Sequence, residues 1–239
     1  MRAIFPPDLE NALKESFFAG VTRGFFVEVG ANDPELLSQT FHLEQRGWTG
    51  VLVEPQPELA ARLAAARKAK VFAVACSSPA NAGKTLTLHL AGIHSSFDPN
   101  LNLATERPVG AIEVPVRTLD DILAEAGAPT PLDLVSIDIE GHEIEALEGF
   151  DLARWAPRLL LIEDLAMDLR LHRYLTGRGY RWFRRTGLNN WYVPAASPAR
   201  ADLQGWLQFF RKYYLGMPFR HWREASRRIR LNRREARRR

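Results

Sequence analysis

The sequence has very little cysteine and no long apolar run. Its 239 residues include one cysteine, Cys76, which excludes an internal disulfide and fits a reducing compartment. No apolar run approaches the roughly 20 residues that a membrane-spanning helix requires. Prolines and charged side chains interrupt residues 1–20, so we expect no signal peptide. With a hydrophobic content of 46%, these absences favour a cytoplasmic globular protein, one α/β domain with appendages.

Acidic residues are scarce only at the C-terminal end. Residues 211–239 contain 12 Lys or Arg and two acids, Glu224 and Glu235, so this segment carries a charge of +10. The whole chain carries +4, which leaves −6 for residues 1–210. A mildly acidic domain therefore precedes a basic tail, and arguments about anionic partners concern the tail alone.

Residues 25–54 have the pattern of a β-α-β unit. The aromatic and β-branched run Phe25–Val29 predicts a buried strand, and the turn that follows it begins at Gly30. A helix is predicted over Thr40–Arg46 and a second strand over Val51–Val53. Glu54 follows the second strand, 24 residues after Gly30. A doubly wound sheet binds a nucleotide at such a place, with the acid accepting hydrogen bonds from ribose hydroxyls.

The turn after the first strand discriminates between cofactors. It contains one glycine, Gly30, of the three that a dinucleotide fingerprint uses, and it carries an acid, Asp33. A carboxylate repels phosphate but suits a ligand that has an amine and a sulfonium. The turn therefore favours S-adenosylmethionine over NAD. The alternative is that Gly30 serves only the geometry of an ordinary α/β turn.

The remaining elements alternate as expected for an α/β domain. Residues 1–24 predict a short capping helix, with Leu9, Leu13 and Phe17 on its apolar face. Further predicted elements are a helix over Glu58–Lys68, strands over Val71–Ala75, Thr85–Leu90 and Ile112–Val116, a helix capped by Thr118, and a terminal hairpin of Tyr180–Arg184 with Asn190–Val193. Residues 91–110 predict an irregular loop over the site, which contains His94.

Acids gather after two predicted central strands. The strand Leu132–Ile137 runs into Asp138, Glu140, His142 and Glu143, and the strand Leu159–Ile162 runs into Glu163 and Asp164. The carboxyl edge of an open α/β sheet is where ligands bind. Two other interpretations stay open: the glutamates are first-turn acids that complement a helix dipole, and His142 is an inert surface residue.

These motifs together resemble the FkbM family of S-adenosylmethionine-dependent methyltransferases. The resemblance is carried by FFVEVGAND, GWTGVLVEPQP, HSSF, VRTLDDIL, SIDIEGHEIEALEGF and LLLIE, and covers about residues 22–195 in the family's order. It implies an α/β class I methyltransferase fold, which is Rossmann-like and doubly wound, with seven strands and a reversed C-terminal β-hairpin. It also implies O-methylation of a hydroxyl on a sugar, glycan or natural product. PELLSQT replaces the glycine-containing turn of many members.

The same resemblance implies roles for individual residues. Asp138 would lie near the methyl group and the amine of the cofactor. Glu140, His142 and Glu143 match the family's acidic box. The other implied cofactor contacts are Glu28, Gly30 and Asn32 at the methionine end, Glu54 at the ribose, and Ala75 and Cys76 at the adenine.

Methyl transfer to a sugar hydroxyl requires removal of a proton, because the neutral hydroxyl is a poor nucleophile. His142 is the first candidate for the base, since its ordinary pKa lies near 6.5. Asp138 is the second candidate, and Glu140 completes the catalytic set. Alternatively, Asp138 and Glu163, with Glu140 or Asp164, hold a magnesium ion, because hard carboxylates suit it.

The tail, residues 199–239, follows a domain that we assign to residues 1–198. Its aromatics recur at helical spacing, and a basic helix is predicted after Pro218. These features fit peripheral contact with an anionic membrane, on its inner face. A docked and partly disordered tail is the alternative. Nucleic acid is a less favoured partner: base methyltransferases commonly carry an Asn/Asp-Pro-Pro-aromatic tetrapeptide after strand four, where this chain has DIEGHE.

Overall fold

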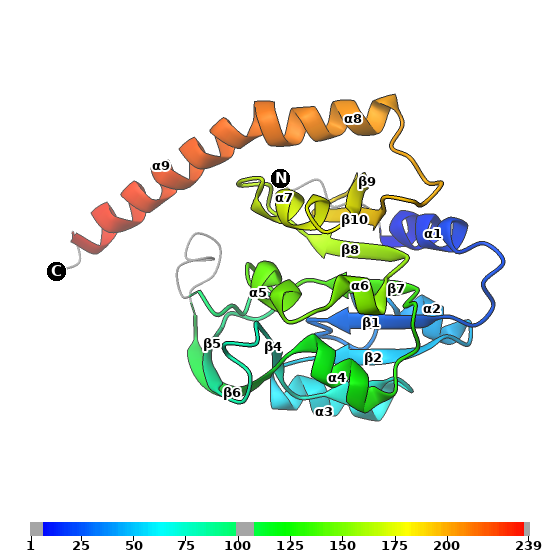
Figure 1. The fold of residues 1–239 in the computed structure, drawn as a ribbon. Coiled ribbons are helices and arrows are strands. Elements are labelled where there is room, and N and C mark those ends of the chain that lie inside the picture. Colours follow the sequence, from blue (N-terminus) through cyan, green and yellow to red (C-terminus); the bar gives the residue numbers. More distant parts are fainter. Residues whose placement is uncertain (1–6, 99–107, 237–239) are drawn as a thin grey trace.

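The computed structural model describes residues 7–98 and 108–236 of the chain (Figure 1). Its centre is a seven-stranded sheet with the strand order β3-β2-β1-β7-β8-β10-β9. The strands are β1 (Phe25–Val29), β2 (Thr49–Val53), β3 (Lys70–Phe72), β7 (Leu134–Ile137), β8 (Leu159–Glu163), β9 (Tyr180–Thr186) and β10 (Asn189–Pro194). Strand β10 lies antiparallel between β8 and β9, while β3, β2, β1, β7 and β8 are parallel. This confirms the predicted doubly wound sheet with a reversed C-terminal hairpin.

Helices cover both faces of the sheet, because alternate strand residues point to opposite faces. Val27 and Val29 pack on one face, whereas Phe26 packs on the other. The first face is covered by α4 (Leu119–Ala126), α5 (Glu143–Glu148), α6 (Leu152–Trp155) and α7 (Arg170–Thr176). The opposite face is covered by α1 (Pro7–Phe17), α2 (Phe41–Gln45) and α3 (Pro57–Ala66).

The third predicted strand is wrong in extent. Strand β3 ends at Phe72, and residues Ala75–Cys76 form β4 in a separate three-stranded sheet with the order β4-β6-β5. The other members are β5 (Thr85–Leu90) and β6 (Gly110–Arg117). Ala75 and Cys76 pair with residues 116–117 of β6, and Ala75 joins a small core with Leu88. Cross-strand pairing and burial against β6 thus remove them from the central sheet.

Helix α1 caps the sheet with two of the three apolar residues predicted for its buried face. Leu13 and Phe17 pack on the core, but Leu9 is 48% exposed. Glu10 and Lys14 are the buried polar residues of this helix. The Lys14 ammonium donates to the carbonyl and side-chain oxygens of Gln39 at 2.6 and 2.9 Å. Polar contacts of Lys14 therefore attach helix α1 to the loop after β1.

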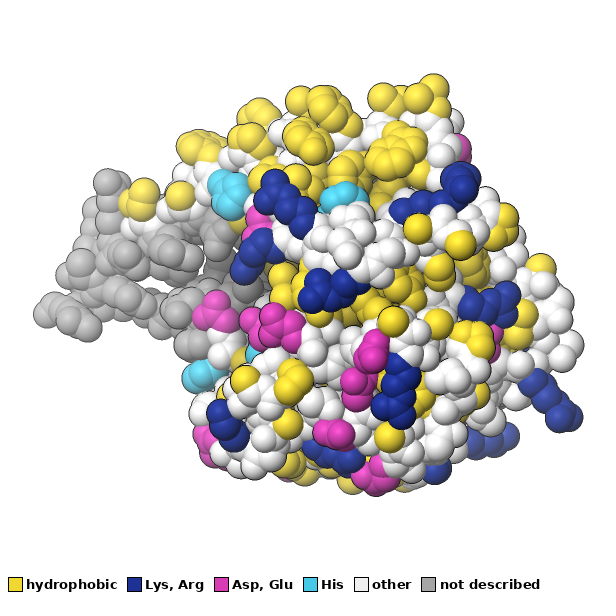
Figure 2. All heavy atoms as spheres, in the orientation of Figure 1, with side chains coloured by type: hydrophobic (Ala, Val, Ile, Leu, Met, Phe, Trp, Pro, Cys, Tyr) yellow, Lys and Arg dark blue, Asp and Glu magenta, His cyan; other side chains and the backbone are white. Residues whose placement is uncertain are grey.

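The C-terminal segment is one long helical element. It consists of α8 (Leu203–Phe210), a π-helical turn η1 (Arg211–Leu215) and α9 (Gly216–Ala236). The helical segment runs through Pro218 rather than starting after it, since α9 begins at Gly216, directly after η1. Phe209 and Tyr213 are buried in the main core, while apolar side chains remain on the outer edge (Figure 2). Within the described ranges no helix is long and apolar enough to cross a membrane.

Candidate active site

Four candidate residues follow one aligned row of the sheet. Val53 pairs with Val29, Val29 with Ile137, and Ile137 with Ile162, so these four positions lie side by side across neighbouring parallel strands. The next residue on each strand is a candidate: Glu54, Gly30, Asp138 and Glu163. The register therefore places a glycine turn and three acids on one carboxyl edge, where open α/β sheets bind ligands.

Gly30 is required by the close approach of two strand ends. Its φ is +83°, a left-handed conformation that favours glycine. A Cβ atom at this position would lie 1.9 Å from the carbonyl oxygen of Asp138. No side chain fits that gap, because the obstacle is backbone. The turn after β1 thus rests directly against the end of β7.

Glu54 holds the same turn from the other side. Its carboxylate accepts the backbone N–H of Asn32 at 2.9 Å and that of Gln56 at 2.9 Å. Asn32 has a φ of 52°, and the bond from Glu54 stabilises that unusual conformation. Burial raises the pKa of the Glu54 carboxyl, while the two N–H donors oppose this rise. Each oxygen makes one of these bonds, so further lone pairs can accept ligand hydroxyls.

Glu28 serves the loop rather than an open surface. The side chain is buried and accepts from the Ser38 hydroxyl at 2.9 Å, from the Gln39 N–H at 2.6 Å, and from the Thr40 hydroxyl. These donors belong to the segment between β1 and α2. Glu28 therefore orders the loop beside the turn, and its implied contact with the cofactor stays a prediction.

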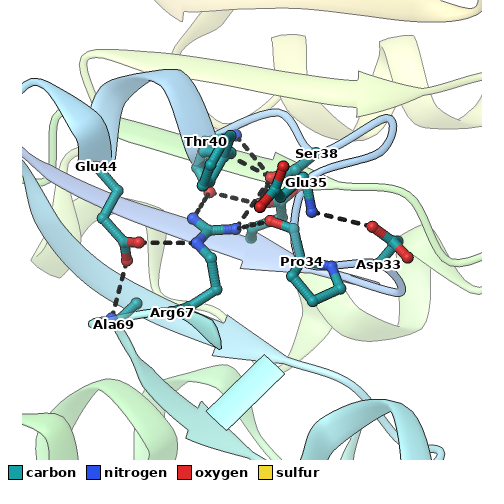
Figure 3. A network of polar contacts seen from close by, with 10 residues as sticks. Asp33, Pro34, Glu35, Ser38, Thr40, Glu44, Arg67 and Ala69 are labelled. Atoms are coloured by element: carbon teal, nitrogen blue, oxygen red, sulfur yellow. Dashed lines mark hydrogen bonds and ion pairs between the residues drawn. The ribbon is translucent and has the colours of Figure 1, made fainter. Parts of the chain in front are cut away.

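Arg67 completes the support of that loop (Figure 3). Its guanidinium forms a buried ion pair with Glu44 at 2.9 Å, with side-chain exposures of 0% and 3%. It also donates to the carbonyl of Pro34 at 2.9 Å and to the hydroxyls of Ser38 and Thr40 at 3.2 and 3.0 Å. A buried arginine that is ion-paired and makes several hydrogen bonds fixes the conformation of the segments that it contacts. The PELLSQT segment is therefore ordered without a glycine.

Asp138, Glu140 and Glu163 form an acidic cluster. Among the described residues they can offer one carboxylate oxygen each, all within 4.8 Å of one another. Glu163 shares a hydrogen bond with Asp138. Asp164, the other acid named from sequence, points away: its carboxylate accepts from the hydroxyl of Tyr213. The cluster can thus hold a proton or a cation at the edge of the sheet.

Two carboxyl groups of the cluster, those of Asp138 and Glu163, have raised pKa values. Burial, then the negative charge of Asp138, raises the pKa of the Glu163 carboxyl well above its ordinary range. Asp138 is accessible to solvent, but protein atoms crowd its carboxyl group, and this burial with the charge of Glu140 raises its pKa to about 6. The hydrogen bond between the two groups lowers the pKa of Asp138 and raises that of Glu163, so Glu163 is the donor and the Asp138 carboxylate is the acceptor.

His94 joins this cluster and was not among the sequence candidates. Its Nδ1 lies 2.6 Å from a carboxylate oxygen of Glu140, and its charge, when present, lowers the pKa of Asp138. The Ser96 hydroxyl donates to the Glu140 carbonyl at 2.8 Å. Glu140 has a φ of 52°, so its backbone is held in an unusual conformation. The HSSF motif was the available signal, since it belongs to the loop expected over the site.

His142 and Cys76 lie apart from the carboxylates just described. His142 Nε2 is 3.0 Å from the Ser77 hydroxyl, and its ring packs at 4.9 Å on Phe97. Burial lowers the pKa of His142, so it is neutral at pH 7.

Ala75 and Cys76 are both buried, and burial raises the pKa of the Cys76 thiol to about 12. Their side chains face protein interior.

Glu143 has the environment expected of a first-turn acid. Its carboxylate accepts the N–H of Gly141 at 3.0 Å and that of Ile139 at 3.3 Å. Burial raises its pKa to about 7, although those donors oppose the rise. Glu143 therefore supports the backbone that carries Asp138 and Glu140.

Comparison with known protein families places the chain. The family model described as the methyltransferase FkbM domain matches residues 28–182. That range contains Glu28 of strand β1 and the four residues of the sheet edge, Gly30, Glu54, Asp138 and Glu163. No curated protein matches the chain.

Proposed function

The chain belongs to the FkbM methyltransferase family, and from this premise we propose that it transfers a methyl group from S-adenosylmethionine to a hydroxyl of a sugar, glycan or natural product. Membership implies methyl transfer and a methyl donor, typically S-adenosylmethionine. The proposal of a hydroxyl acceptor rests on one observation: a histidine paired with a carboxylate stands within the acidic cluster at the carboxyl edge.

The residues of the edge fit the chemistry of the donor. Glu54 would accept hydrogen bonds from ribose hydroxyls, since each of its oxygens already orders one backbone N–H and retains acceptor capacity. Asp138 would bind the amine. Asp33 is bonded to Arg62 and to two backbone N–H groups, which keep its pKa below the ordinary value and its carboxylate charged. An anionic turn of this kind suits a ligand without phosphate. When bound, S-adenosylmethionine supplies an electrophilic methyl group on a cationic sulfur.

We assign removal of the acceptor proton to His94. Glu140 fixes the imidazole by the 2.6 Å contact to Nδ1. A neutral imidazole that donates from Nδ1 carries its lone pair on Nε2, and an imidazole in this tautomer is a competent base. Orientation of the hydroxyl in line with the donor would supply much of the rate, roughly 7–11 kcal/mol in well-oriented systems. His142, the first candidate from sequence, remains the rival base through its contact with Ser77.

A divalent cation is the alternative means of activating the hydroxyl. Asp138, Glu140 and Glu163 offer three hard oxygen ligands within 4.8 Å, which suits magnesium. A bound ion would replace the proton that Glu163 shares with Asp138, so its affinity should rise with pH. Addition of a chelator and then of magnesium distinguishes this alternative from a purely histidine-based mechanism.

The test compares His94→Asn with His142→Asn. Release of S-adenosylhomocysteine is measured with a panel of sugars, glycans and phenolic natural products, and affinity for S-adenosylmethionine is measured separately. We expect His94→Asn to retain cofactor binding and to lose about 10²–10⁴-fold in kcat. His89→Asn, a change on strand β5, is the control. Loss in His142→Asn alone would transfer the base role to His142. Turnover with nucleic acid and with no hydroxyl compound would overturn the proposed acceptor class.

A further inference from the structure

The outer side of the C-terminal helix is an exposed apolar stripe. Nine large apolar side chains on α8, η1 and α9 are each more than half exposed. This outer stripe consists of Leu203, Trp206, Leu207, Phe210, Tyr214, Leu215, Phe219, Trp222 and Ile229. Figure 2 shows apolar side chains along the edge formed by α8 and α9. A contiguous surface of this kind marks an interaction site.

The π-helical turn keeps the stripe continuous. Leu203, Leu207 and Phe210 follow the i, i+4, i+7 spacing of one α-helical face. Leu215, Trp222 and Ile229 recur every seven residues, which is two turns. Leu215 follows Phe210 by five positions, and that step falls on η1. A π turn bonds i to i+5 and takes up the extra residue. Without it, the two halves of the stripe would face different directions.

The opposite face of the helix is already bound to the domain. Phe209 and Tyr213 are buried, and the Tyr213 hydroxyl bonds to Asp164. Arg220 donates to the carbonyl of Ala166 at 2.9 Å, and His221 contacts that of Met167 at 2.6 Å. These contacts fix the orientation of α8 and the start of α9. Most of the outer stripe is therefore turned away from the domain and available to a partner, while Trp206 also packs on Trp182, with ring centroids 5.8 Å apart.

The charge of the helix selects among partners. Residues 211–236 contain nine Lys or Arg and two acids, a charge of +7. A second copy of the chain on this stripe would bring two such segments together and repel. A basic tail that binds nucleic acid acts through its charges, so nucleic-acid binding would not require nine exposed apolar side chains. Aromatic and apolar side chains beside cations are the features of a helix that lies in the plane of an anionic bilayer.

We propose that the outer stripe docks in the plane of an anionic lipid bilayer. The aromatic and leucine side chains enter the interface, and the arginines contact the lipid phosphates. The middle of this helical element contacts residues 164–167 through Tyr213, Arg220 and His221, and those residues directly follow Glu163 of the acidic cluster. Figure 1 shows α9 running past the side of the sheet at which β1 and β8 end. Docking therefore holds the catalytic edge near the bilayer surface.

The test is flotation of the full chain with vesicles of phosphatidylcholine, with and without phosphatidylglycerol. We expect flotation only with the anionic lipid, and weaker flotation at high salt. Phe210→Ser and Trp222→Ser should each weaken binding about tenfold. Val109→Ser is the matched control, since Val109 is 88% exposed and lies outside the stripe. All three positions are exposed, so unchanged thermal unfolding is expected.

Tryptophan fluorescence gives an independent readout. Trp206 and Trp222 are 52% and 71% exposed, whereas Trp48, Trp155 and Trp182 are buried. Vesicles should shift emission to the blue and protect the exposed pair from an aqueous quencher. Absence of flotation with the anionic vesicles would overturn the proposal. Flotation that Phe210→Ser and Trp222→Ser leave unchanged would also overturn it, because such binding would be purely ionic. Concentration-dependent dimerisation that these variants abolish, without vesicle binding, would assign the stripe to a second copy.

Discussion

Replacement of Arg67 by methionine should destabilise the protein strongly, because it leaves the Glu44 carboxylate buried without its cation. The ion pair is 2.9 Å long and almost fully buried. Removing one partner of such a pair costs about 3–5 kcal/mol. For a chain of this size the expected fall in Tm is about 6–20 °C, at 2–4 °C per kcal/mol. The loop at Pro34, Ser38 and Thr40 loses its donors at the same time, so affinity for S-adenosylmethionine should also fall.

The matched control for this prediction is Arg62→Met. Arg62 also pairs with a carboxylate, that of Asp33 at 3.0 Å, but the side chains are 59% and 30% exposed. An exposed pair of this kind contributes about 0–1 kcal/mol. Chemical and thermal unfolding of both variants gives the comparison. The double variant Arg67→Met, Glu44→Gln should recover part of the loss, since it removes the unpaired charge. Equal effects of Arg67→Met and Arg62→Met would refute the role assigned to the buried pair.

Three further predictions concern stability and reactivity. Gly30→Ala should destabilise by about 2–4 kcal/mol and abolish cofactor binding, because the new methyl group would lie 1.9 Å from the Asp138 carbonyl oxygen; unfolding and calorimetric titration measure both. Burial raises the pKa of Glu143 to about 7, so the wild-type protein should lose stability as the pH rises from about 4.5 to 7. The Glu143→Gln variant should therefore be about 1–3 kcal/mol more stable than wild type at pH 8. At pH 4 the variant should show no gain in stability. Cys76, buried with a pKa raised to about 12, should resist alkylation at pH 8 until the protein unfolds; rapid labelling of the native protein would contradict this.

Much of the fold follows from local sequence signals. Strand β1 has the predicted bounds Phe25–Val29, because a run of aromatic and β-branched residues stops at a glycine. The helix capped by Thr118 is also as predicted: its hydroxyl accepts the N–H of Asp121 at 3.1 Å. The order of the strands came from the family resemblance rather than from local signals. Local patterns and family motifs thus place the elements that carry the sheet edge.

The contacts that define the site depend on residues far apart in the sequence. His94 meets Glu140 across 46 residues, and its loop has no periodicity that could signal a partner. Asp164 follows Glu163 directly but points elsewhere, because its carboxylate is bound by the hydroxyl of Tyr213, 49 residues further along the chain. Lys14 lies on the buried face of an amphipathic helix, since Gln39 supplies oxygens there. Such pairings are fixed by tertiary packing and cannot be predicted from spacing alone.

The most direct measurement is a calorimetric titration of S-adenosylmethionine into wild type, Glu54→Gln and Glu113→Gln, with NAD as the control ligand. Glu113 is an exposed acid on β6, away from the sheet edge. We predict micromolar binding of S-adenosylmethionine to wild type and to Glu113→Gln, and no binding of NAD. Binding to Glu54→Gln should be weaker by tenfold or more, a loss of about 1.4 kcal/mol. Absence of binding to wild type, or equal affinity in the two variants, would contradict a methyl-donor site at this edge.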